Sequence, residues 1–243
     1  MSDRIAPKLL AEFIGTFAFV FIGAGASAIV GDAVGSPGIT AIALAHGLTI
    51  MAFAYAYGHV SGGHMNPAVT VGVLAAGAMR SVQAAGYIVS QLVGGVLAAY
   101  LLRLVLNGPA SGLGTPALAH NLSLGITSVT ITPMAGFVIE AVLAFFLVTV
   151  VLSTAVTGRA GNFAPLAIGM TVTLNIIMGG PLTGAAFNPA LVLGPMIVTG
   201  DLSNAWLYTA APVAGALIAV IVSRGLVRLA REPATAPVPT LAE

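Results

Sequence analysis

Charged residues are scarce in this sequence. They make up 6% of the 243 residues, whereas apolar residues make up 58%, and the mean hydropathy is +1.05. A soluble domain carries about 25% charged residues, because they cover its surface against water. This shortage excludes an ordinary soluble domain and predicts a protein embedded in a lipid bilayer.

Cysteine is absent, which excludes disulfides and thiolate metal sites. Basic residues number eight, with a net charge of +1, and they form no stripe that would bind nucleic acid. The histidines and carboxylates show neither the spacing of a metal site nor a nucleophile paired with a base. We therefore expect no metal, no cofactor, no nucleic-acid partner and no enzymatic activity.

Long apolar runs are what the sequence does contain, and a spanning helix needs about 20 mostly apolar residues. Six such runs lie near 9–30, 38–58, 84–106, 134–156, 163–180 and 205–227. Two shorter runs lie near 66–77 and 188–198. The first long run is not followed by a small-residue cleavage pattern, so we expect it to be retained. The sequence predicts an all-α membrane protein with six transmembrane helices and two half-length segments.

The basic residues orient these spans. If both ends of the chain are cytoplasmic, seven of the eight fall on the cytoplasmic side and only Arg103 does not. Cytoplasmic loops carry an excess of Lys and Arg, so this is the topology expected. The Pro- and Ala-rich tail at 232–243 has no apolar period and is expected to be disordered.

An internal repeat relates two halves of the chain, about 8–107 and 133–228. Each half contains an Asn-Pro-Ala motif just before its short apolar segment. The motifs are Asn66-Pro67-Ala68 and Asn188-Pro189-Ala190. Each half holds three spans, and an odd number inserts the two halves with opposite polarity, as in inverted repeats with interrupted helices. The short segments are thus predicted to be re-entrant half-helices.

The residue types of the motif suit a pore. Pro fits the first helical turn, where its missing N–H is not needed. Asn is a good N-cap, and its side-chain NH₂ is expected to stay free to donate into a lumen. Two half-helices entering from opposite sides place the positive ends of their dipoles at the midplane, which repels cations. The pattern predicts a single channel domain over residues 1–231 that passes small neutral molecules.

Each half also carries one carboxylate in its first span, Glu12 and Glu140. A carboxylate inside a membrane is by default a functional candidate. Because these two occupy matching places, we favour a structural role, in which they accept hydrogen bonds from the irregular loops before the half-helices. Proton transfer through them is the alternative.

The paired motifs resemble the aquaporin, or major intrinsic protein, family over about residues 8–228. The resemblance implies a homotetramer in which every protomer has its own pore. In that family four residues form an outer constriction that selects solutes. The matching residues here are His46, Ile176, Ala185 and Leu191. This set, with the stretches ALAH, NII and GPLTGAAFNPALVLGP, resembles the plant tonoplast intrinsic branch.

Leu191 departs from the family, which usually has Arg at this position. The change removes five donors and a permanent positive charge. The filter is therefore predicted to be wide, with His46 as its chief polar side chain, which makes urea, ammonia and hydrogen peroxide candidates beside water. Ordinary helix packing is the alternative for His46.

Two further histidines are candidate pore residues. His64 is expected either in the inner vestibule or in simple loop packing. His120 lies in a loop that resembles the tonoplast type, and we expect it either at the outer mouth or as a solvated loop residue.

Other functions stay open at this point. A strict water channel is one alternative. A proton-coupled transporter also uses broken helices, but it normally needs an ionisable residue at its substrate site, where this chain has Asn. A purely structural membrane protein would not need Asn at both half-helix tips. Short loops, the lack of Cys and the lack of a targeting segment favour a bacterial inner membrane.

Overall fold

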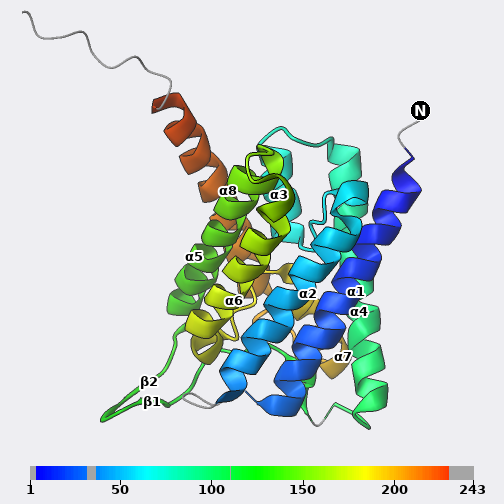
Figure 1. Cartoon of the computed structure of the whole chain (residues 1–243). Helices are drawn as coiled ribbons and strands as arrows, with labels where there is room; N and C mark the ends of the chain where they lie inside the picture. The colour runs from blue at the N-terminus through cyan, green and yellow to red at the C-terminus, as the bar shows by residue number, and fades with distance from the viewer. Residues whose placement is uncertain (1–3, 32–36, 110, 230–243) are drawn as a thin grey trace, which may run out of the picture.

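The computed structural model describes residues 4–31, 37–109 and 111–229 (Figure 1). Within these residues, six helices are long and apolar enough to cross a membrane. They are α1 (Ile5–Val30), α2 (Pro37–Ser61), α4 (Ser81–Val105), α5 (Pro133–Val151), α6 (Ala164–Thr183) and α8 (Ala205–Leu229). The six predicted spans are confirmed to within a few residues. The prediction for the tail at 232–243 lies outside the described residues.

Two short helices complete the bundle, α3 (Pro67–Ala75) and α7 (Pro189–Thr199). Each begins directly after the Asn of an Asn-Pro-Ala motif, with Pro in its first turn. They lie toward opposite ends of the bundle in Figure 1. The predicted pair of half-helices in an inverted repeat is confirmed.

Irregular elements join the spans. The connection from α4 to α5 contains the 3₁₀ turn η1 (Gly112–Gly114) and the strands β1 (Leu122–Leu124) and β2 (Thr127–Val129). The strands pair antiparallel as a hairpin that projects from the end of the bundle opposite the N-terminus (Figure 1). The π-helix η2 (Leu152–Val156) continues α5, and η3 (Gly161–Phe163) precedes α6. The hairpin was not predicted, because three-residue strands are too short to show an alternating pattern.

The two halves meet where α2 crosses α6. A Cβ atom built on Gly169 would lie 2.6 Å from the carbonyl oxygen of Gly47, and one on Gly47 would lie 2.5 Å from that of Gly169. Only glycine at both positions lets the backbones approach this closely. The two glycines occupy matching places in the halves, since each precedes the Asn of its motif by 19 residues, and they mark the axis that relates the halves.

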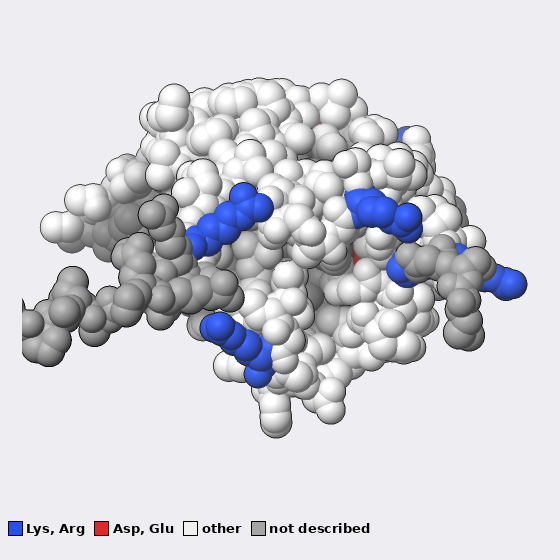
Figure 2. All heavy atoms as spheres, turned by 90° about the horizontal axis from the view of Figure 1, so that it is seen from above, with Lys and Arg blue, Asp and Glu red and all other residues white. Residues whose placement is uncertain are grey.

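Basic side chains gather at one end of the bundle. Figure 2 looks onto the end that bears the N-terminus and shows Lys and Arg side chains spread around a central recess. Arg103, in the last turn of α4, belongs to the opposite end. This distribution agrees with the uneven placement of charge expected from the sequence.

Candidate functional site

The two motif asparagines cap the half-helices. Asn66 Oδ1 accepts a hydrogen bond from the backbone N–H of Ala68 at 2.8 Å, and Asn188 Oδ1 accepts one from Ala190 at 3.0 Å. Both asparagines have extended backbone, as N-cap residues do. The first turn of each half-helix is thus fixed by the residue that precedes its proline.

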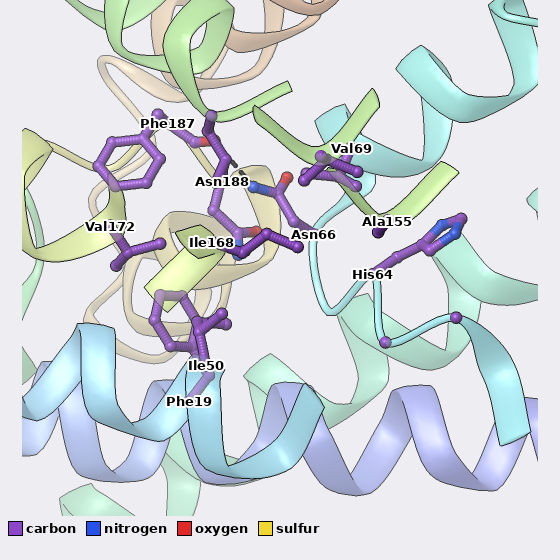
Figure 3. Close-up of a pocket in the computed structure, with 14 residues that line it drawn as sticks. Phe19, Ile50, His64, Asn66, Val69, Ala155, Ile168, Val172, Phe187 and Asn188 are labelled. Atoms are coloured by element: carbon purple, nitrogen blue, oxygen red, sulfur yellow. Dashed lines mark hydrogen bonds between the residues drawn. The ribbon is translucent and has the colours of Figure 1, made fainter. Parts of the chain in front are cut away.

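The side-chain amides also cross between the two motifs. Asn66 Nδ2 donates to the carbonyl oxygen of Phe187 at 3.0 Å, and Asn188 Nδ2 donates to that of Met65 at 2.9 Å. Figure 3 shows the two amides close together among the residues that line the pocket. The expectation that each NH₂ stays free to donate into a lumen applies to only one of its two hydrogens. Each NH₂ has two hydrogens, so one bonds to a carbonyl oxygen of the opposite loop and the other is left to donate.

The carbonyl groups that receive these bonds come from strained residues. Met65 has φ of 49° and Phe187 has φ of 32°, in the region that side chains other than glycine rarely adopt. Such conformations persist only where surrounding contacts hold them. Both residues are buried. Two carboxylates, Glu12 and Glu140, accept hydrogen bonds from their backbone N–H groups.

Glu12 holds the loop before α3. Its Oε1 accepts the Ser61 hydroxyl at 2.6 Å and the His64 backbone N–H at 2.9 Å. Its Oε2 accepts the Met65 backbone N–H and the Gln91 side-chain amide, both at 2.7 Å. Four donors therefore occupy the four acceptor positions of one carboxylate.

Glu140 holds the loop before α7 in the same way. It accepts the Thr183 hydroxyl at 2.6 Å, the Ala186 backbone N–H at 3.0 Å and the Phe187 backbone N–H. Both carboxylates are fully buried. These contacts satisfy backbone groups that water would otherwise have to reach, which supports the structural role favoured from sequence.

The first half carries a polar cluster that the second lacks. Gln91 Nε2 lies 3.0 Å from Thr70 Oγ1, which in turn lies 3.1 Å from Nδ1 of His64. In the second motif, Val192 stands where the first has Thr70, and Ala186 stands where it has His64. The matching loops therefore differ in polarity, although their backbones are held alike.

Two cavities lie on either side of the asparagines. The cavity on the α3 side has an empty volume of about 420 Å³ and is lined by His64, Asn66 and Asn188 among others. The cavity on the α7 side has an empty volume of about 670 Å³ and is lined by His46, Ile176 and Leu191 among others. We call them the inner and outer cavities.

His46 is the ionisable side chain of the outer cavity. Its Nδ1 lies 2.8 Å from the carbonyl oxygen of Ile42, so in the neutral ring Nδ1 carries the proton and Nε2 is an acceptor. Phe19 packs edge-on against the ring at 5.3 Å between centroids. A Cβ at Gly23 would strike the ring, so this glycine leaves the ring its space.

The other predicted filter residues are all buried, but they contribute unequally. Ile176 and Leu191 give the outer cavity an apolar wall. Ala185 is not among the lining residues; its neighbour Gly184 is. The structure therefore brings three of the four predicted residues to one cavity.

His120 does not line the outer cavity. It is exposed in the turn before β1, and residues from η1 and its flanks take the place expected for it. The lining residues from this loop are Ser111, Gly112, Gly114, Thr115 and Pro116. Sequence reasoning missed them, although an apolar Leu113 between two glycines was a signal that this loop turns inward. Leu113 is fully buried.

Metal chemistry has no candidate site in the part of the chain that the structure describes. No group of three or more His, Asp or Glu side chains lies there in a position to hold a metal ion. The polar groups of both cavities are instead amides, hydroxyls and imidazoles. These groups hydrogen-bond small neutral molecules.

Comparisons with known proteins agree with this architecture. The family model described as "Major intrinsic protein" matches residues 2–223. Aquaporin NIP1-2 of Oryza sativa subsp. japonica is 41% identical over 211 residues, covering 85% of this chain and 67% of the relative. Aquaporin TIP1-2 of Zea mays is 40% identical over 225 residues, covering 89% and 84%. The NIP and TIP relatives are thus similar to this chain to nearly the same degree, and the comparisons do not favour the TIP kind.

A solved structure shares the fold. The X-ray structure of the aquaglyceroporin from Plasmodium falciparum matches with a TM-score of 0.76 at 24% identity. The match covers 93% of this chain and 100% of that one.

Proposed function

The chain belongs to the major intrinsic protein family of membrane channels, and from this we propose that it lets water and small neutral solutes cross a bilayer passively. Urea, ammonia and hydrogen peroxide are the solutes proposed beside water. The observation that carries the proposal is the pair of crossed asparagines, Asn66 and Asn188, at the facing N-termini of two half-helices.

The asparagines act as central donors. Each amide spends one hydrogen on the opposite loop, which fixes its orientation, and offers the other to a passing molecule. The helix N-termini add positive potential at the same point. A neutral solute accepts the offered hydrogen bonds, whereas a cation meets repulsion without a compensating carboxylate, because Glu12 and Glu140 are turned toward their loops.

The filter proposed is His46, Ile176, Ala185 and Leu191. Its support is the outer cavity, which three of the four residues line. Leu191 supplies no donor and no charge, so His46 shares the outer cavity with apolar side chains from Ile176 and Leu191. Lining groups help to decide selectivity in such pores, and we propose small solutes beside water because the filter lacks the donors and the charge of an Arg.

The test is stopped-flow light scattering on proteoliposomes, with water and a panel of urea, ammonia and hydrogen peroxide. We expect water and at least urea to cross much faster than in protein-free vesicles, with rates linear in solute concentration. Saturation at low concentration, or dependence on a pH gradient, would favour a coupled transporter. Water flux without solute flux would favour a strict water channel.

Assembly and orientation are further parts of the proposal. We propose a homotetramer with one pore per protomer and both termini in the cytoplasm, the latter supported by the basic end seen in Figure 2. Cross-linking in native membranes tests the first, and protease access to tags at the termini tests the second. A bacterial inner membrane stays a prediction, since the relatives named above are plant proteins and lend it no support.

A further inference from the structure

The C-terminal end of each half-helix accepts a hydrogen bond from an arginine of another helix. Arg224 of α8 donates from Nη2 to the carbonyl oxygen of Ala75, the last residue of α3, at 2.7 Å. Arg103 of α4 donates from Nη1 to the carbonyl oxygen of Val198, in the last turn of α7, at 3.3 Å. The last carbonyl groups of a helix have no partner within it, and cationic side chains near them are stabilising.

The two arginines occupy matching places in the repeat. Arg103 comes sixteen residues after Tyr87 on α4, and Arg224 comes sixteen residues after Tyr208 on α8. The tyrosines themselves make matching bonds, to the carbonyl oxygens of Ser61 and Thr183, each at 2.6 Å. A correspondence of this kind in two independent contacts argues against chance placement of the arginines.

The caps cross between the halves. The half-helix of the first half receives its arginine from the last span of the second, and the reverse holds for the other. Helix α7 also lies directly against α4, since a Cβ at Gly194 would strike the backbone of Gly95. Each half-helix is therefore held at its N-terminal end by an asparagine that bonds to the other half, and at its C-terminal end by an arginine that comes from the other half.

The arginine at α7 also explains an exception in the charge distribution. Arg103 is the one basic residue expected on the outer side, against the general preference for Lys and Arg on the cytoplasmic side. The general preference gives no reason to keep a cation on the outer side. The negative C-terminal end of α7 gives one, because it attracts a positive side chain.

We propose that Arg103 and Arg224 are paired positioning residues of the central cation barrier. They hold each half-helix along its axis. Their positive charges also offset the negative C-terminal ends of the two helix dipoles, so that the positive potential at Asn66 and Asn188 is reduced less by those ends. Helix α3 has nine residues and spans about 13 Å at a rise of 1.5 Å per residue. The barrier role rests on the channel function proposed above, whereas the capping role does not.

The experiment compares Arg103→Met and Arg224→Met, singly and together, with the matching Lys variants. Met keeps much of the length but removes charge and donors. Lys keeps the charge and can donate to one carbonyl. Arg159→Met, in the exposed connection before η3, removes one positive charge far in sequence from either half-helix and is the control.

Two quantities are measured in the purified full-length channel. The first is proton leak relative to water flux in proteoliposomes, which we expect to rise about two- to five-fold per Met variant, the size of a helix-end charge effect. The second is hydrogen–deuterium exchange of the amides at the ends of α3 and α7, which we expect to be faster. The Lys variants should stay near wild type in both, and Arg159→Met should change neither.

The outcomes separate the two roles. Unchanged leak and unchanged exchange in a folded double Met variant would overturn the proposal. Faster exchange with an unchanged leak ratio would overturn the barrier role, and so would equal leak in the Lys and Met variants. If the wild-type protein conducts no water, the channel function fails, and exchange alone decides whether the arginines hold the half-helices. Should the double variant not fold, the single variants give the same readings.

Discussion

The proposed selectivity rests on two side chains of opposite character, the apolar Leu191 and the polar His46. Both line the outer cavity, and His46 keeps one ring nitrogen free because Ile42 binds the other. Leu191 is 2% exposed and comes directly after the Ala of the second motif. The selectivity hypothesis therefore depends chiefly on one apolar side chain at a position where its family usually has a cation.

Replacing Leu191→Arg should narrow and charge the outer cavity. A guanidinium is bulky, planar and permanently charged, so we expect urea flux to fall at least tenfold while water flux falls less. Proton leak should also fall, because a second positive barrier is added. Stopped-flow urea and water rates in matched proteoliposomes measure the change. Leu191→Met is the size control, and an equal urea-to-water ratio in all three proteins would sink the filter assignment.

Asn188 offers a second test at the scale of one residue. Asn188→Asp replaces the amide that donates to Met65 by a carboxylate that cannot donate, at the positive end of α7. We expect cation and proton leak to rise, because a negative charge now sits where cations were repelled. Asn66→Asp should do the same from the other half. Unchanged ion exclusion in both well-folded variants would contradict the central-barrier mechanism.

Among the elements, the half-helices depend on buried carboxylates more than on their own length. Helices of nine and eleven residues are marginal alone. Their first turns are fixed by asparagine caps, and the loops before them by Glu12 and Glu140. Strained residues such as Phe187 can therefore be kept where the pore needs their carbonyl groups.

Glu140→Gln tests this scaffold. One carboxylate oxygen becomes an NH₂ group, so at least one donor among Thr183, Ala186 and Phe187 loses its acceptor. Leaving a buried donor unsatisfied costs about 1–3 kcal/mol. We expect a lower unfolding temperature in detergent with little change in the urea-to-water ratio. If transport stopped while the unfolding temperature held, a proton-relay role for Glu140 would have to be considered again.

For the whole molecule, the contact between α2 and α6 fixes how the halves meet. In Gly169→Ala, the added methyl group would press on the backbone of Gly47 and on Met51. We expect a loss of stability of about 1–3 kcal/mol, as for other overpacked sites, and a fall in flux as the cavities distort. Gly58→Ala on α2 is the control, since nothing lies within 4 Å of its added Cβ. Equal unfolding temperatures of the two variants would show that this crossing does not hold the halves together.

Sequence predicted the parts of this molecule that lipid and local chemistry dictate. Six spans follow from the apolar runs, and two half-helices follow from Asn-Pro-Ala before short segments. Long-range pairings did not follow. The bond from Asn66 to Phe187 joins residues 121 apart, and that from Arg224 to Ala75 joins residues 149 apart. The inward turn of residues 111–116 depends on the burial of Leu113 against neighbouring helices, which the sequence of the loop alone does not contain.

The pairing of Gly47 with Gly169 has a consequence for the sidedness of the pore. It matches His46 of the outer cavity with Ile168 of the inner one, and the motifs match Leu191 with Val69. The connection at residues 111–116, which lies outside the repeat, lines only the outer cavity. The rest of the difference between the two cavities comes from substitutions such as these, an imidazole in one half against an aliphatic side chain in the other. A passive pore remains reversible whatever its mouths look like, so this polarity selects which molecules pass and never the direction in which they go.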